Sequence, residues 1–306
     1  MFHDSDPRST LTVERGTTPR PDPAGYGTPQ LILPRRIPAS VSTPAGSKAW
    51  FVRTASFLVA YYEMMAGDTL ELLPASADRL VIAPHDDEQL HVQSMDSAPA
   101  AAVSGATILI VPGRATITAA TNATVVEAAA WADLEAIPTA VNDAAYTDPM
   151  PRLTEPAVRR VRDLQTGIRS YPLAAYSPSP DRFGRMIVSS NVMANLLETE
   201  DGPRDVSRLS PHTHDDFEQC SITTRGRYLH HWRTPWTPAL PDWQADQHVE
   251  YDSPGIAVIP PGVVHTANSL SKGPNQMLDL FAPPRADFIG KGWVLNAADG
   301  EVGPPS

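Results

Sequence analysis

The sequence predicts an all-β protein in which one chain of 306 residues forms two β-rich regions. Three observations support this prediction. The chain contains 32 prolines, and proline is unfavourable inside helices but common in turns and edge strands. Short runs of β-branched and aromatic residues recur between turn residues, as in all-β sandwiches and barrels. The length also allows two domains of ordinary size.

The runs of β-forming residues divide the chain. Trp50–Tyr62 and Ala106–Val111 lie in the first β-rich region, and Met186–Leu197 opens the second. The segment before the first region and the segment between the two are rich in proline, which predicts extended chain rather than strands. We expect five segments: an N-terminal arm at 1–28, a first barrel at 29–150, a linker at 151–182, a second barrel at 183–296 and a loose tail at 297–306.

Composition and charge exclude several classes of protein. The net charge of −11 argues against nucleic acid or an anionic membrane as partner, because both require a basic surface. The single cysteine, Cys220, excludes a disulfide within the chain. The N-terminus lacks the basic start and apolar run of a signal peptide, and glycine, proline and charged residues interrupt the most apolar window, 100–130. We therefore expect a cytoplasmic protein that acts on a small molecule.

Four residues form a candidate metal site. His212 and His214 are two positions apart, so in a strand their imidazoles point to the same side. Asp215–Asp216 is a turn pair, which would bring Glu218 back to face them. His265 follows a second turn at Pro261–Gly262. Three imidazoles and a carboxylate suit a divalent transition ion: iron, manganese, cobalt, nickel, copper or zinc. Four protein ligands leave one or two positions open on an octahedral metal, as catalysis requires.

These residues resemble the two motifs of the cupin superfamily. The first cupin motif is Gly, five residues, His-x-His, three or four residues, Glu, six residues, Gly; this chain resembles it at His212, His214, Glu218 and Gly226. The second is Gly, five residues, Pro-x-Gly, two residues, His, three residues, Asn; the matching positions are Gly255, Pro260, Gly262, His265 and Asn268.

The match has departures. No glycine precedes His212 at the expected place, and seven residues rather than six separate Glu218 from Gly226. Gly255 lies one residue too close to Pro260, and Asn268 one too close to His265. None of these departures removes a ligand. The resemblance implies a bicupin, with two antiparallel jelly-roll barrels (double-stranded β-helices) in one chain and a metal in the second.

A short internal repeat links the two halves. His85-Asp86-Asp87-Glu88-Gln89 resembles the segment from His214 to Gln219 with one deletion. In this alignment Ala83 takes the place of His212, and Thr116 that of His265. The first barrel would then keep the shape and lose most of the ligands, since His85 and Glu88 alone make a poor metal site.

Strand alternation predicts the wall of the second barrel. If Glu218 points inward, Cys220, Ile222 and Thr224 do so too, and without a bulge Tyr228, His230 and Trp232 follow. His230 would then be an acid or base beside the metal, or a structural histidine. The proline- and tryptophan-rich stretch 234–243 is either a lid or a contact in a homodimer.

Three functions fit this metal site. The first is a dioxygenase in which Fe(II), the favoured metal, has positions open for a substrate and dioxygen, as the resemblance to cupin dioxygenases implies. The second is a lyase, decarboxylase or isomerase in which the metal stabilises an enolate or carboxylate. The third is a module that binds a metal or small ligand for storage or sensing. The ligand set accepts several ions, so it identifies neither the metal nor the substrate.

Overall fold

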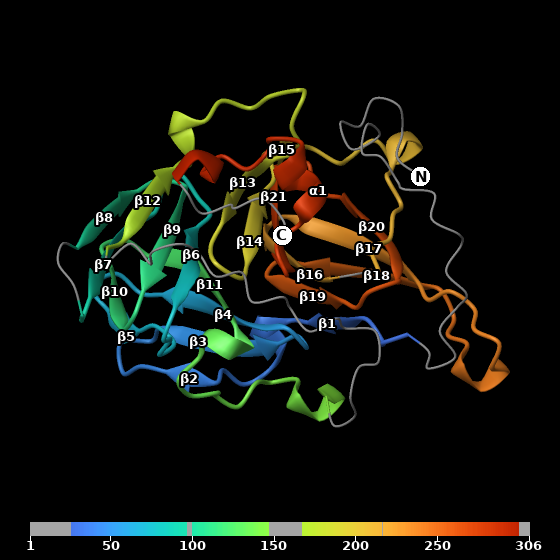
Figure 1. The fold of residues 1–306 in the computed structure, drawn as a ribbon, viewed down its shortest axis with the longest axis horizontal. Helices are drawn as coiled ribbons and strands as arrows, with labels where there is room; N and C mark the ends of the chain where they lie inside the picture. Colours follow the sequence, from blue (N-terminus) through green and yellow to red (C-terminus); the bar gives the residue numbers. More distant parts are fainter. Residues whose placement is uncertain (1–25, 97–99, 147–166, 216, 300–306) are drawn as a thin grey trace.

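The computed structural model describes residues 26–96, 100–146, 167–215 and 217–299. These residues form two barrels of antiparallel strands that lie side by side, the first coloured mainly blue to green and the second mainly yellow to red in Figure 1. The all-β prediction is confirmed, because the only α-helix among the described residues is the short α1 (Ala286–Gly290). No helix in the described ranges is long and apolar enough to cross a membrane.

Each barrel consists of a large and a small sheet. The large sheet of the first barrel has the order β12 (Arg169–Pro172), β9 (Thr107–Pro112), β6 (Asp78–Ala83), β11 (Ala123–Ala130), β4 (Phe57–Met64), β3 (Lys48–Arg53) and β2 (Val41–Ser42). Its small sheet has the order β5 (Thr69–Glu71), β10 (Ala115–Ala119), β7 (Gln89–Ser94) and β8 (Ala101–Ser104).

The second barrel repeats this plan. Its large sheet has the order β1 (Gln30–Ile32), β19 (Gly255–Ile259), β16 (Glu218–Arg225), β21 (Pro274–Ala282), β14 (Met193–Leu196) and β13 (Arg185–Val188), with β15 (Glu200–Asp201) paired to β21. Its small sheet has the order β18 (Gln247–Asp252), β17 (Arg227–Arg233) and β20 (Val264–Ser269). Short 3-10 helices lie between the strands at Pro34–Arg36, Trp131–Asp133, Asp143–Tyr146, Leu173–Ala175, Val206–Arg208, Leu240–Asp242 and Ala297–Asp299.

The two barrels exchange strands. β1, which lies within the range predicted for the first barrel, pairs instead with β19 of the second, with Gln30 opposite Val258 (Figure 1). β12, from the segment expected to link the barrels, pairs with β9 of the first barrel. Each barrel is therefore completed by a strand from outside its own region. Most of the expected arm and tail, residues 151–166 of the expected linker and residues 147–150 of the expected first barrel lie outside the described residues.

The two large sheets pack face to face and bury the apolar core between the barrels. Their strands are buried on both faces, as in β4 and β16, because one face lines a barrel and the other meets the opposite sheet. Strands of the small sheets alternate instead, as β7 does, because one face is solvated. The core between the barrels includes Trp50, Val59, Ile82, Ile110, Val126, Cys220, Ile222, Val258, Leu278 and Leu280.

The interiors of the two barrels differ in polarity. The first is filled by an apolar cluster that includes Leu58, Val81, Leu109 and Ile117. In the second, Gln219, Ser221 and Asp279 are buried and joined by hydrogen bonds. Burying polar groups costs free energy unless they are hydrogen-bonded, and these three side chains are hydrogen-bonded to one another.

A buried arginine takes the corresponding place in the first barrel. Glu127 lies opposite Val81, as Asp279 lies opposite Ser221, so Arg79 is the counterpart of Gln219. Arg79 is fully buried and its Nε lies 3.3 Å from Glu127 Oε1. Its guanidinium also donates to the carbonyls of Leu73 and Gly113. The otherwise apolar interior of the first barrel therefore contains a buried ion pair between Arg79 and Glu127.

The repeat exists in the architecture, but our alignment of it is wrong. His85 follows β6, whereas His214 precedes β16, the strand that corresponds to β6. The similarity between the two His-Asp-Asp segments is therefore a coincidence of two different connections.

Candidate metal centre

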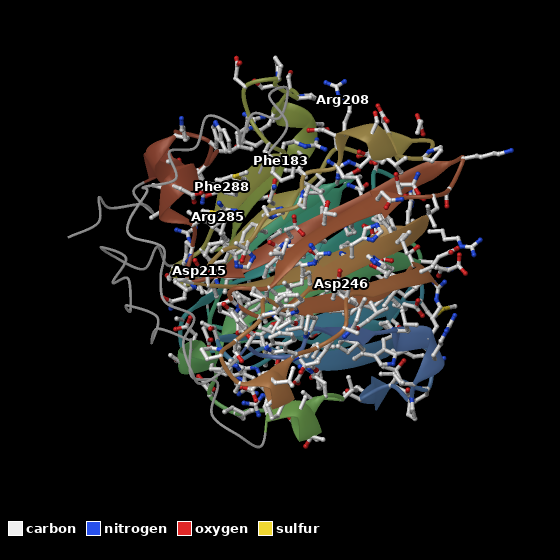
Figure 2. The ribbon with its side chains drawn as sticks, turned by 90° about the vertical axis from the view of Figure 1, so that its right-hand side faces the viewer. Phe183, Arg208, Asp215, Asp246, Arg285 and Phe288 are labelled. Carbon is white, nitrogen blue, oxygen red and sulfur yellow. The ribbon has the colours of Figure 1, made fainter. Side chains whose placement is uncertain are left out.

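The structure brings the three predicted histidines together. The His212 N–H donates to the His265 carbonyl at 3.1 Å, and the His265 N–H donates to the His212 carbonyl at 2.9 Å. This bridge aligns the His-x-His segment with β20. The ring centres of His212 and His265 are 4.4 Å apart, and those of His214 and His265 are 5.1 Å apart. Figure 2 views the second barrel with its side chains; Asp215, next to His214, and Arg285 lie on the same side of it in this view.

Backbone carbonyls fix the tautomer of all three rings. The Nδ1 atoms of His212, His214 and His265 lie 2.9 Å from the carbonyls of Ser210, Phe217 and Val263, respectively. A carbonyl only accepts, so each Nδ1 carries the proton and each neutral ring keeps a lone pair on Nε2. Burial, with His265 and Arg285 nearby, holds the pKa of His214 well below its usual range. Such rings are typical of histidines that bind a metal through Nε2.

The side-chain oxygen of Gln219 lies beside two of the histidine rings and could act as a fourth donor atom. Its Oε1 lies 3.2 Å from His214 Nε2 and 3.3 Å from His265 Nε2. The orientation of its amide is fixed, because its NH₂ group donates to Ser221 Oγ at 2.9 Å and to Asp279 Oδ1 at 3.1 Å. Oε1 and the two Nε2 atoms thus face one another as acceptors, an arrangement that a cation between them would stabilise.

The spacing of these atoms fits a shared ion. Ligands bound at about 2.1 Å to one transition ion lie about 3.0–3.4 Å apart in octahedral or tetrahedral geometry. The described parts of the chain contain no group of three or more His, Cys, Asp or Glu side chains that could hold a metal by themselves. Gln219 Oε1 lies at such distances from the Nε2 atoms of His214 and His265.

The prediction that Glu218 is a ligand is wrong. Glu218 is the first residue of β16 and points to the opposite face, where its Oε2 accepts the Ser56 N–H of the first barrel at 2.9 Å. Burial raises the pKa of Glu218 to about 7. Cys220 and Ile222, which we predicted to point inward with Glu218, likewise point the other way and pack into the core between the barrels. The alternation within β16 is regular, but the inward face is that of Gln219 and Ser221 and not that of Glu218.

Substitutions distinguish these two neighbours. Gln219→Leu is expected to lower metal affinity by at least the 10–100-fold that follows loss of a residue supporting a metal ligand. Glu218→Gln keeps an oxygen for the Ser56 N–H and is expected to keep the wild-type metal content. Elemental analysis of both purified variants gives their metal content. Loss of metal from Glu218→Gln but not from Gln219→Leu would contradict the assignment of Gln219 as the ligand.

His230 faces the candidate centre, as predicted, but the regular alternation from Glu218 on which that prediction relied is absent. It lies on β17 and lines a cavity of about 40 Å³ with His212, Gln219 and His265. A register shift between Thr223 and Arg225 breaks the alternation between β16 and β17, so His230 shares a side with Gln219 rather than Glu218. Its Nδ1 lies 2.6 Å from Tyr251 Oη, and burial lowers its pKa to about 3.

Sequence reasoning missed other residues around this cavity. Ser221 and Asp279 hold the Gln219 amide, and Arg204 lines the cavity with its Nη1 donating to the Ala267 carbonyl at 3.2 Å. Arg204 belongs to no motif, so only the fold could identify it. The cavity has room for about three water molecules, which favours a small substrate.

His85 and Glu88 of the first barrel do not line the cavity at the candidate centre. His85 and Glu88 are buried at the end of β6, and Glu88 accepts the N–H groups of Thr124 at 2.6 Å and His85 at 3.1 Å. The carboxylate of Glu88 therefore stabilises the turn after β6, to which His85 also belongs.

Glu88 gives a prediction for the pH dependence of stability. Burial raises its pKa from 4.5 to about 7. Between these values the folded chain keeps a proton that the unfolded chain releases, so this contribution is present below pH 4.5 and is lost as the pH rises to about 7. We expect Glu88→Gln to reduce the fall in unfolding free energy between pH 5 and 8 by up to about 3 kcal/mol. Urea unfolding at four pH values measures it, with exposed Glu71→Gln as control; equal slopes for Glu88→Gln and wild type would contradict it.

The arrangement of the strands identifies the fold. Two antiparallel jelly-roll barrels in one chain, with paired histidine segments at one end of the second, form the bicupin fold. Comparison with known proteins found no family model and no curated protein that matches the chain.

Solved structures of an enzyme with this fold do match. A mutant of Bacillus subtilis oxalate decarboxylase is 12% identical, with a TM-score of 0.55 over 87% of this chain and 80% of that one. A structure of Bacillus subtilis oxalate decarboxylase at pH 4.6 is 11% identical, with a TM-score of 0.53 over 85% of this chain and 78% of that one. A third, from work on the Mn(II) centres of that enzyme, is 12% identical, with a TM-score of 0.54 over 87% of this chain and 80% of that one. The likeness confirms the fold.

Proposed function

We propose that this chain is a metal-dependent enzyme that acts on a small organic anion. The observation that carries the proposal is the convergence of neutral donors: Gln219 Oε1 within 3.3 Å of the Nε2 atoms of His214 and His265. His212 completes the set. With no carboxylate among the ligands, a divalent ion keeps its full charge, which favours an anionic substrate such as a carboxylate, enolate or catecholate.

The residues around the cavity support this proposal. Arg204 would pair with a substrate carboxylate, since guanidinium groups bind carboxylates in a bidentate manner. If Tyr251 donates its hydroxyl hydrogen to His230 Nδ1, the proton on His230 lies on Nε2. His230 lines the cavity, so it would donate a hydrogen bond to a substrate oxygen. Asp279 and Ser221 hold Gln219 in the ligand orientation.

Oxygenation is the first reaction we propose. Bound Fe(II) would supply open coordination positions and the electrons that activate dioxygen, the oxidant whose atoms enter the product. The protein would orient the substrate through Arg204 and hold its developing negative charge through His230. Both residues contact the cavity that His212 and Gln219 line.

Decarboxylation is the second candidate, favoured by the likeness to oxalate decarboxylase. Here a substrate carbon–carbon bond breaks, carbon dioxide leaves and a proton takes its place. Mn(II) is then the metal to test first, because the matching enzyme has Mn(II) centres. Arg204 and His230 would bind the substrate in either case. Oxygenation and decarboxylation can therefore be distinguished only by the products and by the use of oxygen.

One set of assays tests the proposal. Elemental analysis of the purified protein comes first, followed by reconstitution with Fe(II) or Mn(II) under anaerobic conditions. Oxalate, catechols, diketones and hydroxy acids are then supplied with and without oxygen. Oxygen uptake equal to product formed supports an oxygenase, and release of carbon dioxide without oxygen uptake supports a decarboxylase. A protein that binds neither metal contradicts both.

A further inference from the structure

The cavity at the candidate metal centre has an apolar wall as well as a polar one. Three of the side chains that line it are large and apolar: Phe183, Leu197 and Met277. All three are half-buried, whereas Gln219 and Asp279 in the polar wall are buried. The apolar side chains therefore lie toward the outer end of the cavity, and the donor atoms lie at its inner end.

The pairing of the strands supports this order. Asp279, which accepts a hydrogen bond from the Gln219 amide, and Met277 are two positions apart on β21, so both point into the barrel. Along β21, Met277 is further than Asp279 from the residue that pairs with Gln219. Leu197 adjoins Met277, because its N–H donates to the Met277 carbonyl at 3.1 Å. A molecule that reaches the donor atoms thus extends past an apolar wall.

The charged side chains of the wall favour a single carboxylate. Among the described residues that line the cavity, Arg204 is the only lysine or arginine and Asp279 the only aspartate or glutamate. Arg204 donates to the Ala267 carbonyl at 3.2 Å and forms no ion pair within the described ranges, so its charge is available to a substrate. A second carboxylate would meet either the Asp279 carboxylate or the apolar wall, and both contacts are unfavourable.

We propose, on the basis of the function proposed above, that the site selects monocarboxylates with a short apolar group over dicarboxylates. The carboxylate pairs with Arg204, and the apolar group packs against Leu197, Met277 and Phe183. The cavity has room for about three water molecules, so the carboxylate enters it and the apolar group stays at its outer end. The three apolar side chains are then the residues that determine specificity.

Isothermal titration with a matched pair of acids tests the proposal. Malate has a carboxylate where 2-hydroxybutanoate has a methyl group, and the two are otherwise the same four-carbon hydroxy acid. The full chain is loaded with Mn(II) in the absence of oxygen, and the readout is the heat of binding rather than activity. We expect 2-hydroxybutanoate to bind about ten-fold more tightly than malate, as for a methyl group placed in an apolar pocket.

Variants assign this preference to the apolar wall. Leu197→Lys places an ammonium group beside the second carboxylate, so malate should become the tighter ligand. Leu240→Lys makes the same change at a leucine that is 69% exposed and does not line the cavity, and should keep the wild-type preference. Arg204→Met should weaken both acids about ten-fold and leave their ratio unchanged, since each loses the same charged contact.

Three results would overturn the proposal while leaving the proposed metal centre intact. The loaded protein could bind malate as tightly as 2-hydroxybutanoate, or bind neither acid. Leu197→Lys could keep the wild-type preference although circular dichroism shows it folded and elemental analysis shows it loaded. Met277→Lys introduces the same charge from β21 and replaces Leu197→Lys if that variant is unfolded. Failure of the wild-type protein to bind metal would instead contradict the proposed function, and this inference with it.

Discussion

His214→Ala is expected to purify with almost no bound transition metal and to keep its fold. The variant removes one of four donor atoms and breaks the contact between Nε2 and Gln219 Oε1. Loss of a residue that only supports a ligand costs about 10–100-fold in metal affinity, so loss of the ligand itself should cost more. Activity should fall with the metal, because the open coordination positions are lost with it.

The control variant is His91→Ala, which removes an exposed histidine from β7. Elemental analysis after dialysis gives the metal content of both variants, and circular dichroism verifies that both are folded. The assignment of the site is contradicted if His214→Ala retains the wild-type metal content. Loss of metal from His91→Ala would also contradict it, because that histidine lies in the other barrel.

Glu127→Ala is expected to destabilise the protein by about 3–5 kcal/mol, the cost of breaking a buried ion pair from one side. The substitution leaves the fully buried Arg79 guanidinium without its carboxylate. It also removes the acceptor for the Tyr62 hydroxyl at 2.5 Å and for the Leu73 N–H at 3.0 Å. The measurement is the free energy of unfolding in urea at neutral pH.

A surface ion pair of the same barrel provides the control. Glu63→Ala removes the partner of Arg35, whose side chain is 65% exposed. Exposed pairs contribute about 0–1 kcal/mol, so this variant should remain close to wild type. An effect of Glu127→Ala as small as that of Glu63→Ala would show that Arg79 finds another partner or water, and would contradict its place at the centre of the barrel.

The sequence was sufficient to predict the fold class and to predict that the three histidines lie close together. Their residue types are specific, and each follows or precedes a turn that proline, glycine or aspartate marks. The error at Glu218 was avoidable. The cupin motif allows four residues after His-x-His, and six residues separate Gln219, not Glu218, from Gly226. The spacing of the cupin motif therefore favours Gln219. We predicted Glu218 because a carboxylate is the more common metal ligand.

Other features could not be predicted from the sequence. β1 and β12 have three and four residues and lie in proline-rich segments, so they are too short to have a detectable alternation. In the sequence, Arg79 is a charged residue at the start of an apolar strand. Only the pairing of β6 with β11 shows that it lies against Glu127. Arg204 reaches the cavity from a connection between strands, where sequence pattern carries no information about direction.

Anomalous diffraction from crystals of the protein as purified tests the central claim most directly. We expect one peak in the second barrel at the absorption edge of a transition metal. The metal should be bonded to Nε2 of His212, His214 and His265 and to Oε1 of Gln219. Glu218 should remain on the opposite face of β16, bound to the Ser56 N–H. A metal held by Glu218, or the absence of a peak among the three histidines in crystals that contain the metal elsewhere, would contradict the account.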